Sequence, residues 1–200
     1  MRTWLKNIQW CPGCWDTLIV AAVKSAFKEL WIESHKRVVV SWIWCSGKAS
    51  QYIDGYWAET LHWRTLPFAT WIKLVKPELT VVAMWWDWDW YWIWMGHFIH
   101  ACKKNLNITY LVFNNENYAL TTGQSSPTTP IWAKTKTTPT WNIIPPFNPI
   151  ALAIDAWCSF AKRVQASKFT ELKDTIKEAI MHPWFAIIDI EQDCPSFKRW

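Results

Sequence analysis

Four of the six cysteines are spaced as ligands of a metal or an iron–sulfur centre. Cys11 and Cys14 form C-P-G-C, Cys45 lies in W-C-S-G-K, and Cys194 lies in D-C-P-S-F. A C-x2-C pair with two remote cysteines can supply four thiolates to zinc or to an iron–sulfur cluster, and spacing does not separate the two. Unrelated free thiols are the structural alternative.

An acidic residue and two amides follow two successive predicted strands. Asp87 ends an apolar run, and Asn114 and Asn115 follow the next one. Carboxylate and amide oxygens are ligands that Mg²⁺ accepts while it holds the phosphates of a substrate. The alternative is that Asp87 caps a helix and the two asparagines form a turn. The pattern thus indicates a cation site that depends on where the strands end.

Helical and strand-like patterns alternate along the chain. Apolar spacing predicts helices over Thr17–Ile32, Thr60–Val75, His97–Lys104, Pro149–Ala156 and Phe169–Met181. Apolar and β-branched runs predict strands over Arg37–Val40, Leu79–Met84, Ile108–Phe113 and Phe185–Ile190, with a short strand before the last helix. Residues 121–147 form a Thr- and Pro-rich connection long enough to be functional. The alternation predicts an α/β fold with a parallel sheet and ligands at the carboxyl ends of its strands.

Length and charge exclude some classes of function. Two hundred residues suit one domain, 1–200, with a substantial core. The formal charge of +5 comes from scattered Lys and Arg, which does not indicate nucleic-acid binding. No secretory signal is evident, and the apolar stretch Val81–Met95 carries two Asp and is too short to span a bilayer. We expect a cytoplasmic protein with no membrane segment, in which Cys102 and Cys158 are buried free thiols.

Tryptophan is abundant where a turn requires small residues. The chain has 20 Trp and 5 Gly, and residues 85–94 read W-W-D-W-D-W-Y-W-I-W. Six indoles in such a run cannot all be buried, since each brings about 150–250 Å² of surface. With glycine at these positions, the run becomes a turn whose backbone N–H groups can approach a diphosphate. If the indoles are real, an aromatic platform for sugars or single-stranded nucleic acid is the alternative.

Several segments together resemble a known family. They are W-C-P-G-C, S-W-I-W-C-S-G-K-A-S, L-H-W-R-T-L-P-F-A-T-W-I-K-L, W-W-D-W-D, G-H-F-I-H-A, F-N-N-E, A-L-T-T-G-Q-S-S-P-T-T-P and D-C-P-S-F. In this order they resemble the β subunit of 2-oxoacid:ferredoxin oxidoreductases, over nearly the whole chain. The resemblance implies the thiamine-diphosphate-binding fold with a [4Fe-4S] cluster.

The resemblance also implies a role for individual residues. It implies cluster ligation by Cys11, Cys14, Cys45 and Cys194. It implies Mg²⁺ binding by the side chains of Asp87 and Asn115 and by the backbone carbonyl of Asn117. Contacts with thiamine diphosphate are implied for Ile43, Trp44, Cys45, Ser46, Trp88, Asp89, Ala119 and Leu120. Lys48 is the position assigned to the carboxylate of the substrate.

The chain departs from the family in one consistent way. Trp replaces family glycine at 15, 42, 44, 57, 63, 71, 85, 86, 88, 90, 92 and 94, and we extend this to 132, 141, 157 and 184. Random mutation would not choose one amino acid each time. We hypothesise that UGA codons, translated as Trp, are read as Gly in the source organism. Trp10 is expected to be genuine, and the chain is expected to be truncated at its C-terminus.

The implied activity is oxidative decarboxylation of a 2-oxoacid, 2-oxoglutarate or pyruvate, to acyl-CoA with electrons passing to ferredoxin. Coenzyme A is the implied co-substrate. The carboxylate that activates the cofactor is expected on a partner α subunit, so that the β chain works only as part of a heterodimer. The rival interpretations are a non-oxidative thiamine-dependent enzyme and a zinc-stabilised binding module.

Overall fold

The core of the molecule is a six-stranded parallel sheet. The computed structural model describes residues 8–87 and 95–197. The strands are β1 (Arg37–Ser41), β2 (Tyr56–Glu59), β3 (Thr80–Trp86), β4 (Thr109–Asn114), β7 (Phe160–Gln165) and β8 (Ala186–Glu191). Their order across the sheet is β2-β1-β3-β4-β8-β7, and every neighbouring pair is parallel. The predicted parallel α/β sheet is confirmed.

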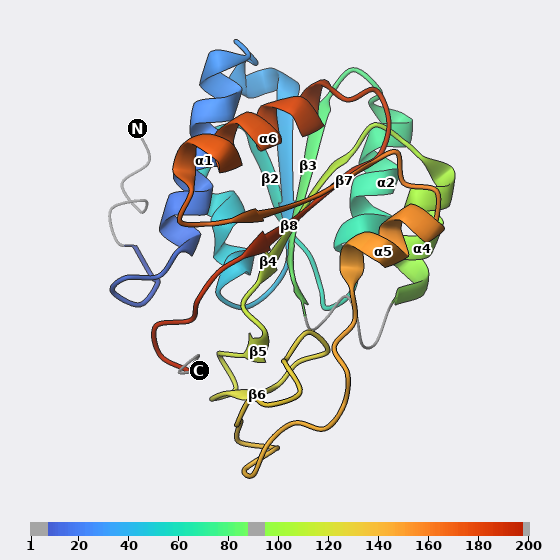
Figure 1. The fold of residues 1–200 in the computed structure, drawn as a ribbon. Coiled ribbons are helices and arrows are strands. Elements are labelled where there is room, and N and C mark those ends of the chain that lie inside the picture. The colour runs from blue at the N-terminus through green and yellow to red at the C-terminus, as the bar shows by residue number, and fades with distance from the viewer. Residues whose placement is uncertain (1–7, 88–94, 198–200) are drawn as a thin grey trace.

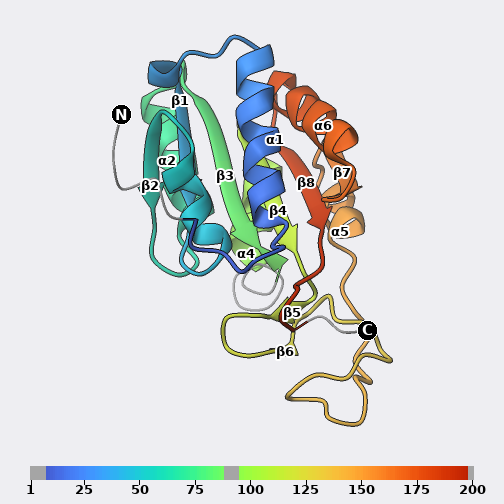
Figure 2. The ribbon, with the colours of Figure 1, turned by 90° about the vertical axis from the view of Figure 1, so that its left-hand side faces the viewer.

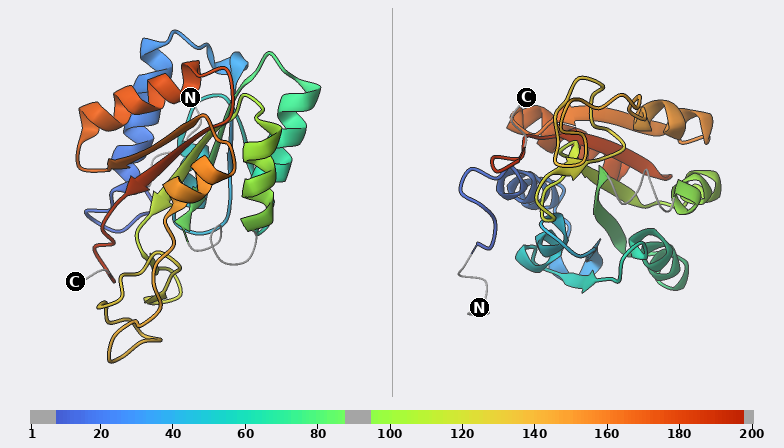
Figure 3. Two further views of the ribbon diagram at one scale, coloured as in Figure 1. Left: turned by 45° about the vertical axis from the view of Figure 1, so that its right-hand side comes forward. Right: turned by 90° about the horizontal axis from the view of Figure 1, so that it is seen from below.

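Helices cover both faces of this sheet. The helices are α1 (Asp16–Glu29), α2 (Thr65–Val75), α4 (Met95–Lys104), α5 (Pro149–Asp155) and α6 (Phe169–Met181). Helices α1 and α6 lie together on one face, and α2, α4 and α5 lie on the other (Figures 1 and 3). The central strands β3 and β4 are buried along almost their whole length, as expected of strands covered on both sides. Among the described helices, none is long and apolar enough to cross a bilayer.

The start of one predicted helix differs from the structure. Helix α2 begins at Thr65 and not at Thr60, because the backbone N–H of Thr60 donates to the carbonyl of Ser41 at 2.9 Å. That bond continues the parallel pairing of β1 with the edge strand β2, which was not predicted because its four residues, exposed or half-buried, form no apolar run. The short helices η2 (Ser34–Lys36) and η3 (Ser46–Tyr52) were not predicted either.

The carboxyl ends of the strands all point to one edge of the sheet, the lower edge in Figure 1. A long excursion leaves this edge after β4. It begins with the small antiparallel pair β5 (Asn117–Tyr118) and β6 (Gln124–Ser125) and includes the connection 121–147. Figure 2 shows the excursion extending well beyond the sheet. The residues predicted to do chemistry therefore come from loops that leave a single edge.

Candidate functional site

Asp87 is a buried carboxylate at the end of β3. Its side chain is fully buried, and its Oδ2 accepts a hydrogen bond from Thr128 Oγ1 at 2.8 Å. Its Oδ1 is buried and has no hydrogen-bond partner among the residues that the structure describes. Burial raises the pKa of Asp87 to about 7, although hydrogen bonds from Ser126 and Thr128 act in the opposite direction. A buried anion with a free oxygen is costly unless something positive faces it.

Two asparagines present further oxygens beside β4. The backbone N–H of Asn117 donates to Asn115 Oδ1 at 3.2 Å, and Asn117 Nδ2 donates to the Asn115 carbonyl at 3.0 Å. Asn117 Oδ1 is buried without a partner in the described part of the chain. The backbone carbonyl of Asn117 accepts a bond from the N–H of Ala119 at 3.1 Å, and a carbonyl oxygen has two lone pairs. The turn requires a positive φ of 58° at Glu116.

The oxygens around Asp87 fit a hard divalent cation. Asp87 Oδ1 and Asn117 Oδ1 are both buried acceptors without donors within the described residues, a state that usually costs about 1–3 kcal/mol each. The donor set contains one carboxylate and neutral amide or backbone oxygens, which suits Mg²⁺ with phosphate oxygens completing its shell. The amide of Asn117 was not predicted as a ligand. Its free oxygen makes it a candidate beside the carbonyl.

The four predicted cysteines come from three segments that meet at the same edge. Cys11 and Cys14 share a tight turn, in which the N–H of Cys14 donates to the carbonyl of Cys11 at 3.0 Å. Trp10 Nε1 donates to the carbonyl of Cys45 at 2.6 Å, which joins this turn to the loop after β1. Ser196 Oγ donates to Cys11 Sγ at 3.5 Å, which brings the segment after β8 to the same place.

The electrostatics of the thiols show that the four cysteines are neighbours. Burial raises the pKa of Cys45 to about 12, with smaller contributions from Asp16, Cys11 and Cys194, while Lys48 lowers it. Burial also raises the pKa of Cys14, followed by Asp16, Cys45 and Cys194. The four cysteines therefore lie near one another in the structure. Yet no three His, Cys, Asp or Glu side chains of the described residues surround a point where one metal ion could sit.

Other predicted contact residues lie around these two sites. Ile43, Trp44 and Lys48 are partly buried in the loop and short helix after β1, and Ser46 Oγ is buried with no partner among the described residues. Ala119 is buried, whereas Leu120 is 53% exposed. Trp88 and Asp89 lie outside the described residues. The predicted residues therefore lie on loops at the carboxyl ends of β1, β3 and β4.

Three residues of the site were not predicted. Thr128 Oγ1 lies 2.8 Å from Asp87 Oδ2 and 3.0 Å from Asn114 Oδ1, so it links the ends of β3 and β4. Asp16 and Gln192 form a buried hydrogen bond of 2.9 Å beside the cysteines. The S-S-P-T-T segment was noticed only as part of the resemblance, because a hydroxyl far away in sequence carries no spacing signal.

Several Trp residues occupy backbone conformations that favour glycine. Seven non-glycine residues of the described ranges have positive φ, and four of them are Trp, at 54°, 85°, 67° and 70° for Trp31, Trp44, Trp63 and Trp157. For a bulky L-residue such angles are outliers, because Cβ approaches the backbone too closely. Trp31 was not among the positions predicted to be glycine, so the backbone adds it to the set.

Trp31 and Trp157 follow helices in the same capping motif. The N–H of Trp31 donates to the carbonyl of Lys28, and the N–H of the next residue donates to Phe27. The N–H of Trp157 donates to Ile154, and the N–H of Cys158 donates to Ala153. This is the Schellman pattern, whose left-handed residue is most often glycine. Both indoles are largely exposed, 89% for Trp31 and 85% for Trp157, so packing does not explain them.

Indoles also occupy the interior at the edge where the site lies. Trp42, Trp85 and Trp86 are at most 2% exposed, at the ends of β1 and β3. The buried Nε1 of Trp86 has no hydrogen-bond partner in the described part of the chain, although buried indoles normally find one. The backbone here is close-packed, since a Cβ on Gly47 would lie 1.6 Å from the carbonyl oxygen of Trp42. Trp10 differs, because its indole donates a hydrogen bond.

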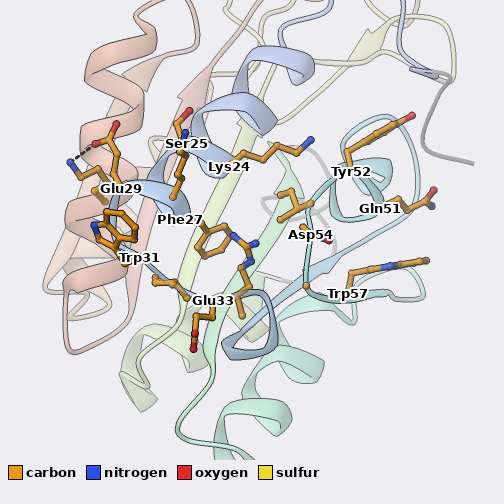
Figure 4. Close-up of a pocket in the computed structure, with 16 residues that line it drawn as sticks. Lys24, Ser25, Phe27, Glu29, Trp31, Glu33, Gln51, Tyr52, Asp54 and Trp57 are labelled. Atoms are coloured by element: carbon orange, nitrogen blue, oxygen red, sulfur yellow. Dashed lines mark hydrogen bonds and ion pairs between the residues drawn. The ribbon is translucent and has the colours of Figure 1, made fainter. Parts of the chain in front are cut away.

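A recess of about 1390 Å³ lies elsewhere, between α1, the end of η3 and β2 (Figure 4). It opens near the amino ends of β1 and β2, whereas ligands of open parallel sheets bind at the carboxyl ends. Trp31 and Trp57 line it. Both are candidate glycines, so the shape of this recess depends on side chains that are themselves in question.

Comparisons with known proteins agree with this geometry. The family model for the C-terminal TPP-binding domain of thiamine pyrophosphate enzymes matches residues 34–190. The 2-oxoglutarate synthase subunit KorB of Archaeoglobus fulgidus is 42% identical over 100% of this chain and 74% of its own length. The 2-oxoacid:ferredoxin oxidoreductase 2 subunit beta of Aeropyrum pernix is 41% identical over 99% of this chain, which spans 66% of that relative.

Solved structures show the same relation. A 2-oxoglutarate:ferredoxin oxidoreductase from Magnetococcus marinus, with 2-oxoglutarate, coenzyme A and succinyl-CoA bound, matches with a TM-score of 0.94 and 35% identity, over 96% of this chain and 66% of its own. A benzoylformate decarboxylase from Polynucleobacter necessarius matches with a TM-score of 0.61 over 94% of this chain and 34% of its own, at 14% identity, which shows the fold alone. The chain therefore belongs to the thiamine pyrophosphate enzymes and, within them, to the beta subunits of the 2-oxoacid:ferredoxin oxidoreductases.

Proposed function

We propose that this chain is the cofactor-binding subunit of an enzyme that converts a 2-oxoacid and coenzyme A into acyl-CoA and carbon dioxide. Each turnover releases two electrons, which two ferredoxin molecules accept one at a time. The observation that carries the proposal is the meeting of a buried oxygen site and four cysteines at one edge of the sheet. A cation site alone would fit many thiamine enzymes, and the thiols supply the route for electrons.

The oxygen site would hold Mg²⁺ and, through it, the diphosphate of thiamine diphosphate. Asp87 and Asn115 would bind the ion through their side chains, and Asn117 through its backbone carbonyl or its amide oxygen. The bound cofactor supplies the chemistry for cleaving the bond next to a keto group, while the protein orients it and excludes water. Thr128 would hold the carboxylate of Asp87 in position through their hydrogen bond.

The cysteines Cys11, Cys14, Cys45 and Cys194 would hold a [4Fe-4S] cluster. Such a cluster fits a reaction that must pass its two electrons to one-electron carriers. The raised pKa values of Cys14 and Cys45 mean that these thiols keep their protons when the site is empty, so that binding of iron must displace them. Lys48, near Cys45 and partly buried, is the candidate to bind the carboxylate of the substrate.

The geometry around the proposed cofactor site supports the hypothesis that most of the Trp residues are glycine in the native protein. Indoles at 42, 85 and 86 fill the interior at the ends of β1 and β3, next to Asp87. A diphosphate needs backbone N–H groups in close approach, which glycine permits and an indole blocks. The positive φ values at 31, 44, 63 and 157 point to the same residue type. We call the sequence with glycine at the family positions and at 31 the glycine reading.

The substrate is proposed as 2-oxoglutarate rather than pyruvate. The names of the Archaeoglobus and Magnetococcus relatives both specify 2-oxoglutarate, and the Magnetococcus structure holds 2-oxoglutarate and succinyl-CoA. An α subunit is the proposed partner, since the relatives are themselves named as subunits. The complex is proposed to be cytoplasmic, where ferredoxin is available.

A non-oxidative thiamine enzyme is the second candidate. It is favoured only by the fold, which the benzoylformate decarboxylase shares. Such an enzyme has no use for four neighbouring thiols. The two candidates therefore differ in whether iron is present and whether carbon dioxide release reduces an acceptor.

The test uses the chain purified without oxygen together with its α subunit. We expect about four iron and four sulfide per chain, bound thiamine diphosphate, and reduction of ferredoxin that requires both 2-oxoglutarate and coenzyme A. Asp87→Asn should lose the cofactor and keep the iron, and Cys45→Ser should lose the iron. Stoichiometric zinc without iron, or decarboxylation without reduction of ferredoxin, would contradict the proposal.

The glycine reading has its own test. Intact mass of the chain from its natural source should fall below the mass calculated from this sequence by multiples of about 129 Da, the difference between Trp and Gly residues. Fragmentation should place glycine at 31, 44, 63 and 157. Genuine Trp at these four positions, or UGG codons there, would overturn it.

A further inference from the structure

Asp16 and Gln192 form a buried polar contact between the two ends of the described chain. Asp16 lies in the first turn of α1, two residues after Cys14, and Gln192 follows β8, two residues before Cys194. Gln192 Nε2 donates to Asp16 Oδ1 at 2.9 Å. The two side chains are 0% and 6% exposed. The contact therefore joins the two segments that bring the first and the last of the four cysteines.

The backbone of Gln192 connects the same point to the cation site. Its N–H donates to the carbonyl of Asn114 at 2.8 Å, directly before the proposed ligand Asn115. Asn114 Oδ1 lies 3.0 Å from Thr128 Oγ1, which also contacts Asp87. A chain of short contacts through buried groups thus runs from the cysteines to the carboxylate at the end of β3.

The chemistry of this pair is unusual for a contact that only supports the fold. Asp16 Oδ2 and Gln192 Oε1 are both buried without partners among the described residues. Each such atom costs free energy, and two apolar side chains would pack at the same place without that cost. Two apolar side chains could not form the directional hydrogen bond that Asp16 and Gln192 form.

We propose that Asp16 and Gln192 are positioning residues that fix the segment of Cys194 against the turn of Cys11 and Cys14, and so fix the distance between the cysteine site and the cation site. The reason for positioning the cysteines rests on the proposed function, whereas the test of the positioning role does not depend on that function. The contact forms without any cofactor, so it preassembles the four thiols in the empty protein. Loss of the contact would remove the side-chain hydrogen bond that ties the segment of Cys194 to the start of α1, and would leave the bond from Gln192 N–H to Asn114 and the weak Ser196–Cys11 contact.

The test measures the distance between thiols in the cofactor-free protein. The full chain is reduced, freed of the reductant and treated anaerobically with a short bifunctional thiol reagent such as dibromobimane. The yield of the Cys14–Cys194 cross-link is measured by peptide mass spectrometry. Gln192→Met keeps the size of the side chain and removes the donor, so we expect the yield to fall at least severalfold. Gln192→Glu should have the same effect, because it places two carboxylates opposite each other.

Rescue separates positioning from general stability. In the double variant Asp16→Asn with Gln192→Glu, the new amide donates to the new carboxylate, so the bond returns with its direction reversed. We expect the cross-link yield to return to that of the unaltered chain. Lys173→Met is the control, since it removes one of the two described ion pairs of α6 with Glu29 on α1 and lies away from the cysteines. It should leave the yield unchanged.

The result that overturns the proposal is a yield unaffected by Gln192→Met, or a double variant that cross-links no better than Gln192→Glu alone. A rescued yield in a chain that binds zinc in place of iron would uphold the positioning pair and refute the proposed function. If the chain holds its full iron and is active, but these variants leave the cross-link yield unchanged, the proposed function is upheld and the positioning role of Asp16 and Gln192 is refuted.

Discussion

At the scale of single residues, backbone φ angles distinguish positions that favour glycine from positions that favour tryptophan better than side-chain contacts do. Trp31 and Trp157 make the hydrogen bonds of a glycine-ended helix while their indoles point into solvent. The sequence pattern predicted Trp157 by comparison with the family, but it could not predict Trp31. A helix-capping residue is recognised by its φ angle and by the backbone hydrogen bonds around it. The amino-acid sequence alone shows neither.

The strain at these caps can be measured in the literal chain. Trp31→Gly should raise the free energy of unfolding in urea by about 1–2 kcal/mol, the cost of a left-handed conformation for an L-residue. Trp71→Gly is the matched control, because it makes the same change inside the right-handed helix α2. There glycine should lower the free energy of unfolding by up to about 1 kcal/mol. Changes of the same sign at both positions would show that the backbone angle is not the cause.

Asp189 gives a prediction about pH. It is fully buried on β8, and burial raises its pKa from 3.8 to about 6 although Arg163 Nε donates to it at 2.8 Å. The folded state therefore holds this proton more tightly than the unfolded chain does. Stability from this group is present below the unfolded pKa and is lost as the pH rises to about 6.

Asp189→Asn should remove this component. Urea unfolding between pH 4 and pH 6 should show a smaller loss of stability than in the unaltered chain, with a difference of at most about 3 kcal/mol for a shift of this size. Equal slopes for the two proteins over this range would contradict the assignment to Asp189.

At the scale of elements, the sequence predicted what periodicity can show. The buried strands and amphipathic helices lie close to their predicted places, because apolar spacing records which face is covered. The edge strand β2 escaped prediction because its partly exposed residues show no apolar run. The cysteines and Asp87 were predicted as site residues because their chemistry is rare and their spacing is regular. Thr128 was not, since only the path of the excursion brings its hydroxyl to Asp87, forty-one residues away in sequence.

The excursion should therefore contribute to cation binding. Thr128→Val keeps the shape of the side chain and removes the hydroxyl that contacts Asp87 and Asn114. We expect Mg²⁺-dependent binding of thiamine diphosphate to weaken about tenfold or more, as is usual when the support of a metal ligand is lost. Thr128→Ser retains the hydroxyl and should bind nearly as well as the unaltered chain. Isothermal titration in the glycine reading measures both, and equal weakening in the two variants would point to packing rather than hydrogen bonding.

At the scale of the whole molecule, the chain spans 66% of the Aeropyrum relative and of the Magnetococcus structure. We propose that the carboxylate that activates the cofactor comes from the α subunit.

We expect the purified chain to bind its cofactors and to show no 2-oxoglutarate-dependent reduction of ferredoxin alone. Addition of the proposed α subunit should restore that activity, measured anaerobically by the bleaching of ferredoxin. Full activity without a partner would show that the activating carboxylate lies on this chain.

The position of the last cysteine has a consequence for biogenesis. Cys11, Cys14 and Cys45 precede most of the sheet in the chain, whereas Cys194 follows β8, the last of the described strands. Translation therefore supplies Cys194 only after all six strands of the described sheet have been synthesised. A cluster held by all four thiols, as proposed, can be completed only after that point, so its insertion can report that the sheet has been made.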